Sequence, residues 1–226
     1  MTKKTTVEPQ YDPCLALRDA QGFSRFGLMS NYVWNDDPKR VTFLLSRYKF
    51  VSKMFSGSKR VLEIGCADAF GTRIVRREVE NLTAVDFDPI FIEDAAASAD
   101  ERWPITFLVQ DVLKGPVPGD FDAAYSLDVI EHIAPSDESQ FISNISKSLS
   151  ATGKLIIGSP SLESQVHASP ASKAGHVNCK SGPGLKVLME KFFHNVFIFS
   201  MNDEVVHTGY TPMAHYLFAL CCNKKI

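Results

Sequence analysis

Acidic residues follow three of the apolar segments in this sequence, and a turn of small residues follows a fourth. The turn spans residues 65–71 (GCADAFG), and the acids are Asp86, Asp111 and Asp128. Small side chains let the backbone approach a ligand closely, and carboxylates accept hydrogen bonds from hydroxyl and amino groups. The pattern therefore predicts a small-molecule site shared by several segment ends.

The turn argues against one common ligand, a nicotinamide dinucleotide. Its fingerprint needs a second glycine where the backbone meets the pyrophosphate. Here Ala67 occupies that position, and Asp68 would place negative charge beside the diphosphate. An adenosine without phosphates fits better, because Asp86 can accept both ribose hydroxyls, Phe87 can stack on adenine and Asp111 can accept from its amine.

The elements that must position these residues alternate in type. Strand-like runs occupy 60–65, 82–87, 105–110, 121–128, 154–159, 195–201 and 214–222, and helical patterns occupy 38–55, 70–79, 89–98, 135–149 and 182–193. This order predicts an α/β fold with a doubly wound, mostly parallel sheet of seven strands. The last two strands have only loop between them, so we expect an antiparallel hairpin. Ligands of such sheets bind at the carboxyl ends of the strands.

The N-terminal 37 residues differ from the rest of the chain. Polar residues there are interspersed with Phe23, Phe26, Tyr32 and Trp34. We expect residues 1–37 to form a helical flap, and residues 38–226 to form the ligand-binding domain.

Four motifs in order carry a family resemblance: EIGCADAFGT, VDFD, QDV and SLDVIEHI. Together they resemble the class I S-adenosylmethionine-dependent methyltransferases, most of all the quinone-biosynthesis and sugar O-methyltransferases. The resemblance covers about residues 38–222. It implies a Rossmann-like methyltransferase fold, S-adenosylmethionine as cofactor and a small-molecule acceptor. Ala67 departs from the usual second glycine of the family.

The resemblance also implies roles for single residues. The methionine half of the cofactor would be lined by Glu63, Gly65, Cys66, Ala67, Asp68 and Phe70, the ribose and adenine by Asp86 and Phe87, the adenine edge by Asp111 and Val112, and the sulfonium side by Leu127 and Asp128. Structural roles are the alternatives: Glu63 as a partner of turn amides, Asp111 as a helix cap and Phe87 as core.

Methylation of an alcohol requires removal of its proton, a task that suits histidine. His132 follows the fourth strand directly and is the leading candidate for the catalytic base; its alternative is to brace the next helix. His176, in KAGHVNCKS, is the second candidate, with a substrate or bracing role. Asp128, Glu131 and His132 together suggest a divalent metal, but three neighbours in sequence rarely converge on one ion, so we predict none.

The sequence says less about the chemical class of the molecule that receives the methyl group. The segment 159–181 is long, polar and serine-rich, which suggests a lid over a sugar or another polar metabolite. The aromatic residues of the flap favour a quinol-like acceptor instead, and an amine acceptor also stays open. A non-catalytic cofactor-binding regulator or scaffold is the alternative from another class, because fold alone does not establish activity.

Charge, hydropathy and cysteine content indicate which partners and which cellular compartment to expect. The net charge is −2, and no run of Lys or Arg exceeds two residues, which argues against a nucleic-acid surface. The N-terminus does not read as a secretory signal, and MAHYLFALCC is too short to span a bilayer. Five cysteines without a C-x-x-C motif indicate reduced thiols. We therefore expect a cytoplasmic protein without membrane or nucleic-acid partners. Its oligomeric state stays open, with a homodimer among the alternatives.

Overall fold

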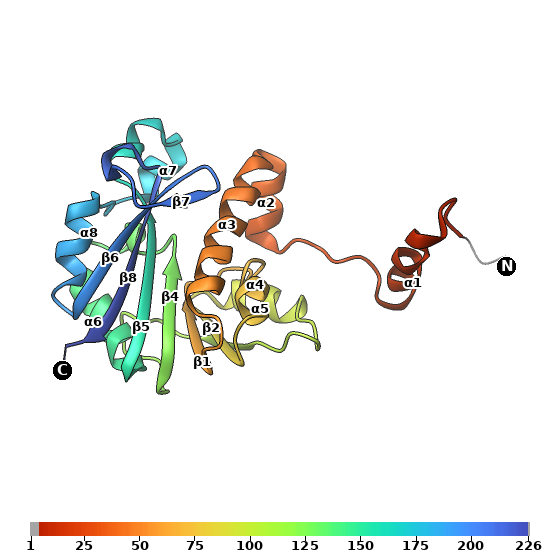
Figure 1. The fold of residues 1–226 in the computed structure, drawn as a ribbon, viewed down its shortest axis with the longest axis horizontal. Helices are drawn as coiled ribbons and strands as arrows, with labels where there is room; N and C mark the ends of the chain where they lie inside the picture. The colour runs from red at the N-terminus through yellow and green to blue at the C-terminus, as the bar shows by residue number, and fades with distance from the viewer. Residues whose placement is uncertain (1–4, 226) are drawn as a thin grey trace.

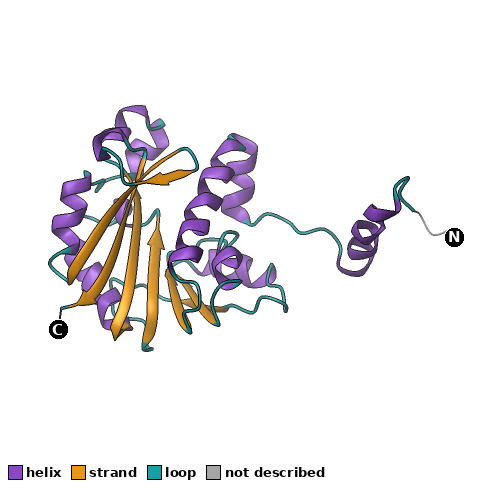
Figure 2. Ribbon diagram, viewed as in Figure 1, coloured by secondary structure: helices purple, strands orange, loops and turns teal. Residues whose placement is uncertain are grey.

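The computed structural model describes residues 5–225, which form an eight-stranded sheet between two layers of helices (Figures 1 and 2). The strands are β1 (Arg60–Ile64), β2 (Asn81–Asp86), β3 (Thr106–Val109), β4 (Phe121–Leu127), β5 (Leu149–Pro160), β6 (Phe193–Asn202), β7 (Val205–His207) and β8 (Tyr216–Lys224). The predicted α/β class is confirmed.

The strand order is β3-β2-β1-β4-β5-β8-β6-β7. The first five strands are parallel, and β8 lies antiparallel between β5 and β6. The chain runs outward from β1 toward β3 and then returns to continue with β4 on the other side, so β1 and β4 flank the switch point. In such sheets ligands bind beside the carboxyl ends of the strands at this point.

Residues on successive positions of a strand face opposite layers, as the pleat requires. Val61 packs in the cluster that contains residues of α3 (Lys39–Met54), α4 (Thr72–Arg76) and α5 (Pro89–Ala97). Leu62 packs in the cluster that contains residues of α6 (Glu138–Ser148) and α8 (Gly182–Met189). The central strands are thus apolar on both faces, which explains their continuous apolar sequence.

The C-terminal part confirms one prediction and corrects two. Strands β6 and β8 pair antiparallel, as expected. The connection between them holds an additional strand, β7, so the sheet has eight strands rather than seven; its three residues pair only with β6 and are too few for a readable alternation. The predicted lid at 159–181 is not a plain loop, because it contains η3 (Glu163–His167) and α7 (Pro170–Gly175). Figure 1 shows α7 at the end of the sheet toward which β4 points.

The N-terminal segment is helical, as predicted, but only part of it packs on the domain. After η1 (Pro9–Tyr11), helix α1 (Asp12–Gln21) buries none of its residues and stands away from the sheet (Figure 1). Helix α2 (Leu28–Asp36) lies against α3 and buries Ser30 and Val33. None of the helices between residues 5 and 225 has the length and apolarity needed to cross a membrane.

This difference between α1 and α2 leads to a stability prediction. Removal of residues 1–21 should change the free energy of unfolding by less than about 0.5 kcal/mol, because α1 buries nothing. Removal of residues 1–36 should cost roughly 1–3 kcal/mol, because Val33 loses its burial and α2 its contacts. Urea unfolding of the full chain and both truncated chains measures this; equal losses for the two deletions would contradict it.

Candidate functional site

The turn after β1 has an unusual backbone. Gly65, Ala67 and Ala69 all have positive φ, at 75°, 45° and 53°. Alanine rarely adopts this conformation, and such strain tends to concentrate at functional sites. Gly65 is also required by space, since a Cβ there would lie 2.3 Å from Cγ2 of Val129. Cys66 and Ala69 are buried, so the turn packs against the hydrophobic core.

Asp86, at the end of β2, holds this turn in place. Its Oδ2 accepts the Ala67 amide at 2.9 Å and its Oδ1 accepts the Asp88 amide at 3.0 Å. Each carboxylate oxygen can accept a further hydrogen bond. The next residue, Phe87, is 73% exposed, so the alternative that it is a core residue is wrong. An exposed aromatic face beside a buried carboxylate is what a nucleoside would require.

Asp68 binds the N-terminal flap. Its carboxylate accepts the Ser30 amide at 2.6 Å and the Ser30 hydroxyl at 3.1 Å, at the N-terminus of α2. Asp94 accepts the Leu28 amide at 2.7 Å. The first amides of a helix lack partners within it and carry partial positive charge, so the two acids stabilise this end. A lining role for Asp68 at a cofactor stays a prediction, but its carboxylate already has partners in the flap.

Aromatic rings extend the contact between flap and turn. The ring of Phe26 lies 5.0 Å from that of Phe70 and 5.3 Å from that of Trp34, between ring centroids. Gly27 fits there because it has no side chain: a Cβ would lie 2.3 Å from Cβ of Asp68. The flap therefore sits directly on the turn. Sequence reasoning missed the Ser30–Asp68 pair because 38 residues separate its members.

Glu63 is buried beneath the turn. Its carboxylate accepts hydroxyl hydrogen bonds from Tyr48 (2.8 Å), Tyr125 (2.8 Å) and Thr72 (2.6 Å). The alternative expected for Glu63 was turn amides, so its actual partners are different. Burial raises the pKa of Glu63 to about 7, and the three hydroxyl donors only partly offset this effect.

The segment after β3 holds Asp111 and Val112. Asp111 accepts the Leu113 amide at 3.0 Å within a turn and lies 3.2 Å from the ammonium of Lys114. It therefore stabilises a turn and does not cap a helix. Val112 is buried, and its carbonyl accepts from the Asn144 amide at 2.7 Å.

The end of β4 carries Leu127 and Asp128. Leu127 is buried, and Asp128 has a positive φ of 57°. Both oxygens of Asp128 lie close to Nη1 of Arg47, at 2.6 and 2.8 Å. The guanidinium carbon of Arg47 lies 3.9 Å from the ring centroid of Tyr216. Sequence reasoning missed Arg47 and Tyr216, since neither belongs to a motif and both reach the site from distant elements.

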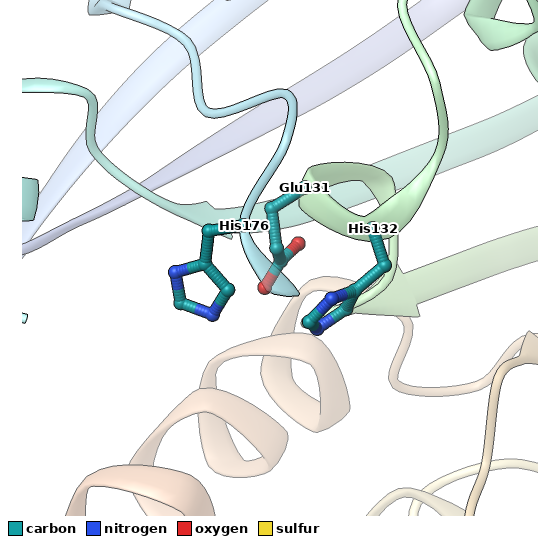
Figure 3. Close-up of side chains that lie close together, drawn as sticks. All are labelled: Glu131, His132 and His176. Atoms are coloured by element: carbon teal, nitrogen blue, oxygen red, sulfur yellow. The ribbon is translucent and has the colours of Figure 1, made fainter. Parts of the chain in front are cut away.

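Beyond Asp128, three side chains converge. Glu131 and His132, in η2 (Ile130–His132), meet His176, which follows α7 (Figure 3). One ligand atom of each residue lies within 4.8 Å of the others. Both histidines were predicted as site residues, and the structure brings them together, with ring centroids 5.2 Å apart.

Hydrogen bonds define the tautomers of both rings. Nδ1 of His132 lies 2.9 Å from the Gly175 carbonyl, which can only accept, so Nδ1 donates. Nδ1 of His176 lies 2.8 Å from Oε1 of Gln165, whose Nε2 donates to the Ser161 carbonyl at 3.1 Å and so fixes the amide orientation. Each neutral ring therefore presents Nε2 with a free lone pair.

Glu131 completes the cluster without a partner of its own. It is 1% exposed, and neither carboxylate oxygen has a hydrogen bond within the part of the chain that the structure describes. Burial raises the pKa of Glu131 to about 8, and the charge of Asp128 adds to the effect. The charge of Arg47 and the nearby hydroxyl of Ser159 favour the ionised form but only partly offset it. Burial, and then the charge of His132, lower the pKa of His176, which favours its neutral form.

A separate cavity of about 1150 Å³ is lined by α1 and the segment after it on one side, and by residues of α4 and α5 on the other. Asp68 and Phe70 border it, whereas Asp86, Asp128 and the histidine cluster are not among its described lining residues. The cavity adjoins the flap side of the turn and is not the strand-end site.

Comparison with known proteins shows which family the central part of the chain matches and which proteins resemble it. Residues 62–157 match the methyltransferase domain family. A probable S-adenosylmethionine-dependent methyltransferase of Mycobacterium tuberculosis is 28% identical over 105 residues, which are 46% of this chain and 36% of the relative. A ubiquinone biosynthesis O-methyltransferase of Xanthomonas euvesicatoria is 26% identical, over 59% of this chain and 58% of the relative. The chain thus spans little more than a third of the mycobacterial relative.

Among solved structures, the N-methyltransferase NodS of Bradyrhizobium japonicum, in complex with S-adenosylhomocysteine, superposes with a TM-score of 0.62. The superposition covers 84% of this chain and 90% of NodS, at 22% identity. This similarity shows a shared fold, and it supports the predicted Rossmann-like architecture.

The buried carboxylate of Glu63 generates a pH prediction. Its pKa is raised in the folded protein, so between about pH 4.5 and 7 the folded state keeps a proton that the unfolded state has lost. Its contribution to stability is therefore lost as the pH rises through this window. The unfolding free energy of wild type minus that of Glu63→Gln should fall by roughly 3 kcal/mol from pH 4.5 to 7. Urea unfolding at several pH values measures it; a constant difference would contradict it.

Proposed function

We propose that this chain, whose residues 62–157 belong to the methyltransferase domain family, binds S-adenosylmethionine and methylates a hydroxyl group of a small polar acceptor. The observation that carries the proposal is the row of groups along one sheet edge. The strained turn at 65–71, the Asp86–Phe87 pair and the histidine cluster follow the ends of β1, β2 and β4. These are the strand ends where ligands of this fold class bind.

The residues present suit the adenosine part of this cofactor. Asp86 is held by two backbone amides and keeps acceptor capacity for ribose hydroxyls. Phe87 offers an exposed face to the adenine. The methionine half would lie along the turn from Gly65 to Phe70, with Asp111 at the adenine edge and Asp128 toward the sulfonium.

S-adenosylmethionine supplies a methyl group on positively charged sulfur, which leaves as a neutral thioether. This chain must therefore align the acceptor, exclude water and take up the acceptor proton. As the new O–CH3 bond forms, the O–H bond breaks, and the proton leaves toward the cluster of Glu131, His132 and His176. Arg47 holds Asp128 beside this cluster, and we expect the acceptor to lie against this pair.

The segment between β5 and α8 supports a polar acceptor. It is held together by the Ser161–Lys180 bridge and by the Gln165–His176 hydrogen bond. Its serine and amide groups offer partners to a hydroxylated molecule such as a sugar or glycan precursor. The similarity to a ubiquinone biosynthesis O-methyltransferase supports a quinol as the second candidate, and NodS similarly supports an amine.

Asp86→Ala should weaken the binding of S-adenosylhomocysteine about 10- to 150-fold, because a charge-assisted hydrogen-bond partner is lost. Asp88→Asn is the matched control, since asparagine also caps α5, and it should bind as wild type does. Calorimetric titration measures both. Unchanged affinity of a folded Asp86→Ala variant would remove Asp86 from the site, and tight NAD binding without any response to S-adenosylhomocysteine would overturn the proposed function.

His132→Gln should lower kcat on the true acceptor about 10²–10⁴-fold, because the acceptor proton loses its route. Affinity for S-adenosylhomocysteine should stay nearly unchanged. His167→Gln is the control, since His167 is exposed on η3 and lies outside the cluster. Release of S-adenosylhomocysteine in a screen of sugars, quinols and amines provides the assay. Normal turnover of the His132→Gln variant on an alcohol would contradict the assignment, and no turnover of any acceptor would favour a non-catalytic binding protein.

A further inference from the structure

We propose that Glu131, His132 and His176 form a binding site for one divalent first-row transition-metal ion. From the sequence alone we predicted no metal, because Asp128, Glu131 and His132 are close neighbours in the chain. In the structure the third ligand is His176 rather than Asp128, and His176 lies 44 residues after His132 in the sequence. The site itself stands on geometry alone. Its use in ionising the acceptor hydroxyl rests on the proposed function.

The ligand atoms of the three side chains converge. One nitrogen from each histidine and one oxygen of Glu131 lie within 4.8 Å of one another (Figure 3). Metal–ligand bonds of about 2.0–2.2 Å place ligand atoms on opposite sides of an ion at most about 4.4 Å apart, and those on adjacent positions closer. Small rotations of the three side chains are therefore enough to surround an ion.

Each imidazole is oriented as a metal ligand by a hydrogen bond of its other ring nitrogen. Metal-binding histidines usually donate their other ring nitrogen to a carbonyl or carboxylate, which fixes the ring. His132 donates to the Gly175 carbonyl, and His176 donates to the Gln165 amide oxygen. Gln165 is itself held by the Ser161 carbonyl. Both Nε2 atoms are thereby left with lone pairs.

The side chain of Glu131 is buried without a hydrogen-bond partner among the described residues. Buried carboxylates almost always have partners, because desolvation without a hydrogen bond costs several kcal/mol. Both oxygens of Glu131 lack one within residues 5–225, although the side chain is 1% exposed. If the two histidines only braced the segment before α8, this carboxyl group would be buried without a hydrogen bond even in its neutral form. A cation between the three residues accounts for it.

Charge and ligand type define the ion. The nearby charges of Arg47 and Asp128 are paired with each other, so Glu131 is the acidic group left to face the site. It would give up its proton when an ion binds. Two imidazoles and one carboxylate suit Mn²⁺, Fe²⁺, Co²⁺ or Zn²⁺ and do not suit Ca²⁺, which prefers oxygen ligands. Three protein ligands leave coordination positions open. An acceptor hydroxyl that enters one of them would ionise more easily, because a bound cation lowers the pKa of a coordinated hydroxyl. Its proton would then pass to solvent water, since the ion occupies the lone pairs of Glu131, His132 and His176.

Titration of the full chain with Co²⁺, after treatment with a chelator, tests the site directly. Visible absorption should show one equivalent of Co²⁺ bound through imidazole nitrogen. His176→Ala and Glu131→Gln should abolish that spectrum. Gln165→Leu keeps all three ligands but removes the partner of His176, so it should weaken Co²⁺ binding about 10- to 100-fold. His167→Ala, on the exposed surface of η3, should bind Co²⁺ as wild type does.

Circular dichroism and S-adenosylhomocysteine titration of the same samples report folding and the cofactor site independently. The inference is overturned if wild type binds no Co²⁺, or if folded His176→Ala and Glu131→Gln variants bind it like wild type. If Co²⁺ binding fails while S-adenosylhomocysteine still binds, the proposed function stands and His132 acts on the acceptor directly. If Co²⁺ binds and S-adenosylhomocysteine does not, the metal site stands and the proposed function falls.

Discussion

The carboxylate of Glu63 is the interaction on which the rest of the structure depends. It lies on β1 and accepts hydrogen bonds from the hydroxyl groups of Tyr48 on α3, Thr72 on α4 and Tyr125 on β4. Four elements are thereby joined at one buried point directly beneath the turn. The close approach of α3 is possible because Gly71 lacks a Cβ, which would lie 2.3 Å from the Tyr48 ring. A buried polar network of this kind specifies one arrangement of its elements when its members are satisfied.

Strain and unpaired polar groups gather at the edge of the sheet above this network. Ala67, Ala69 and Asp128 adopt positive φ, although none is glycine. Close to Asp128, the Arg47 Nε, the Tyr216 hydroxyl and both Glu131 oxygens are buried without hydrogen-bond partners among the described residues. These features cost stability, and folded proteins usually retain them where a ligand supplies the missing interactions. The opposite edge of the sheet has no such concentration in the part of the chain described.

The sequence predicted what depends on local pattern. Strand and helix periodicity located the elements of the parallel sheet, and acids at strand ends located the edge where Asp86 and Asp128 lie. Contacts between distant segments were not predictable in this way. Ser30 donates to Asp68, Arg47 pairs with Asp128, and His176 meets His132 only because the tertiary fold brings them together. Short elements such as β7 were not predicted either, since three residues are too few to show an alternation of apolar and polar residues.

Helix α3 explains how these separate parts form one site. Its neighbouring residues Arg47 and Tyr48 reach two different acids, Asp128 at the end of β4 and Glu63 on β1. The same helix packs against α2, whose first turn binds Asp68 in the strained turn. Any shift of α3 along the sheet would therefore change the turn, the end of β4 and the flap together. The flap, the turn and the region next to the histidine cluster are thus parts of one mechanical unit, and a ligand that stabilises one of them should order the others.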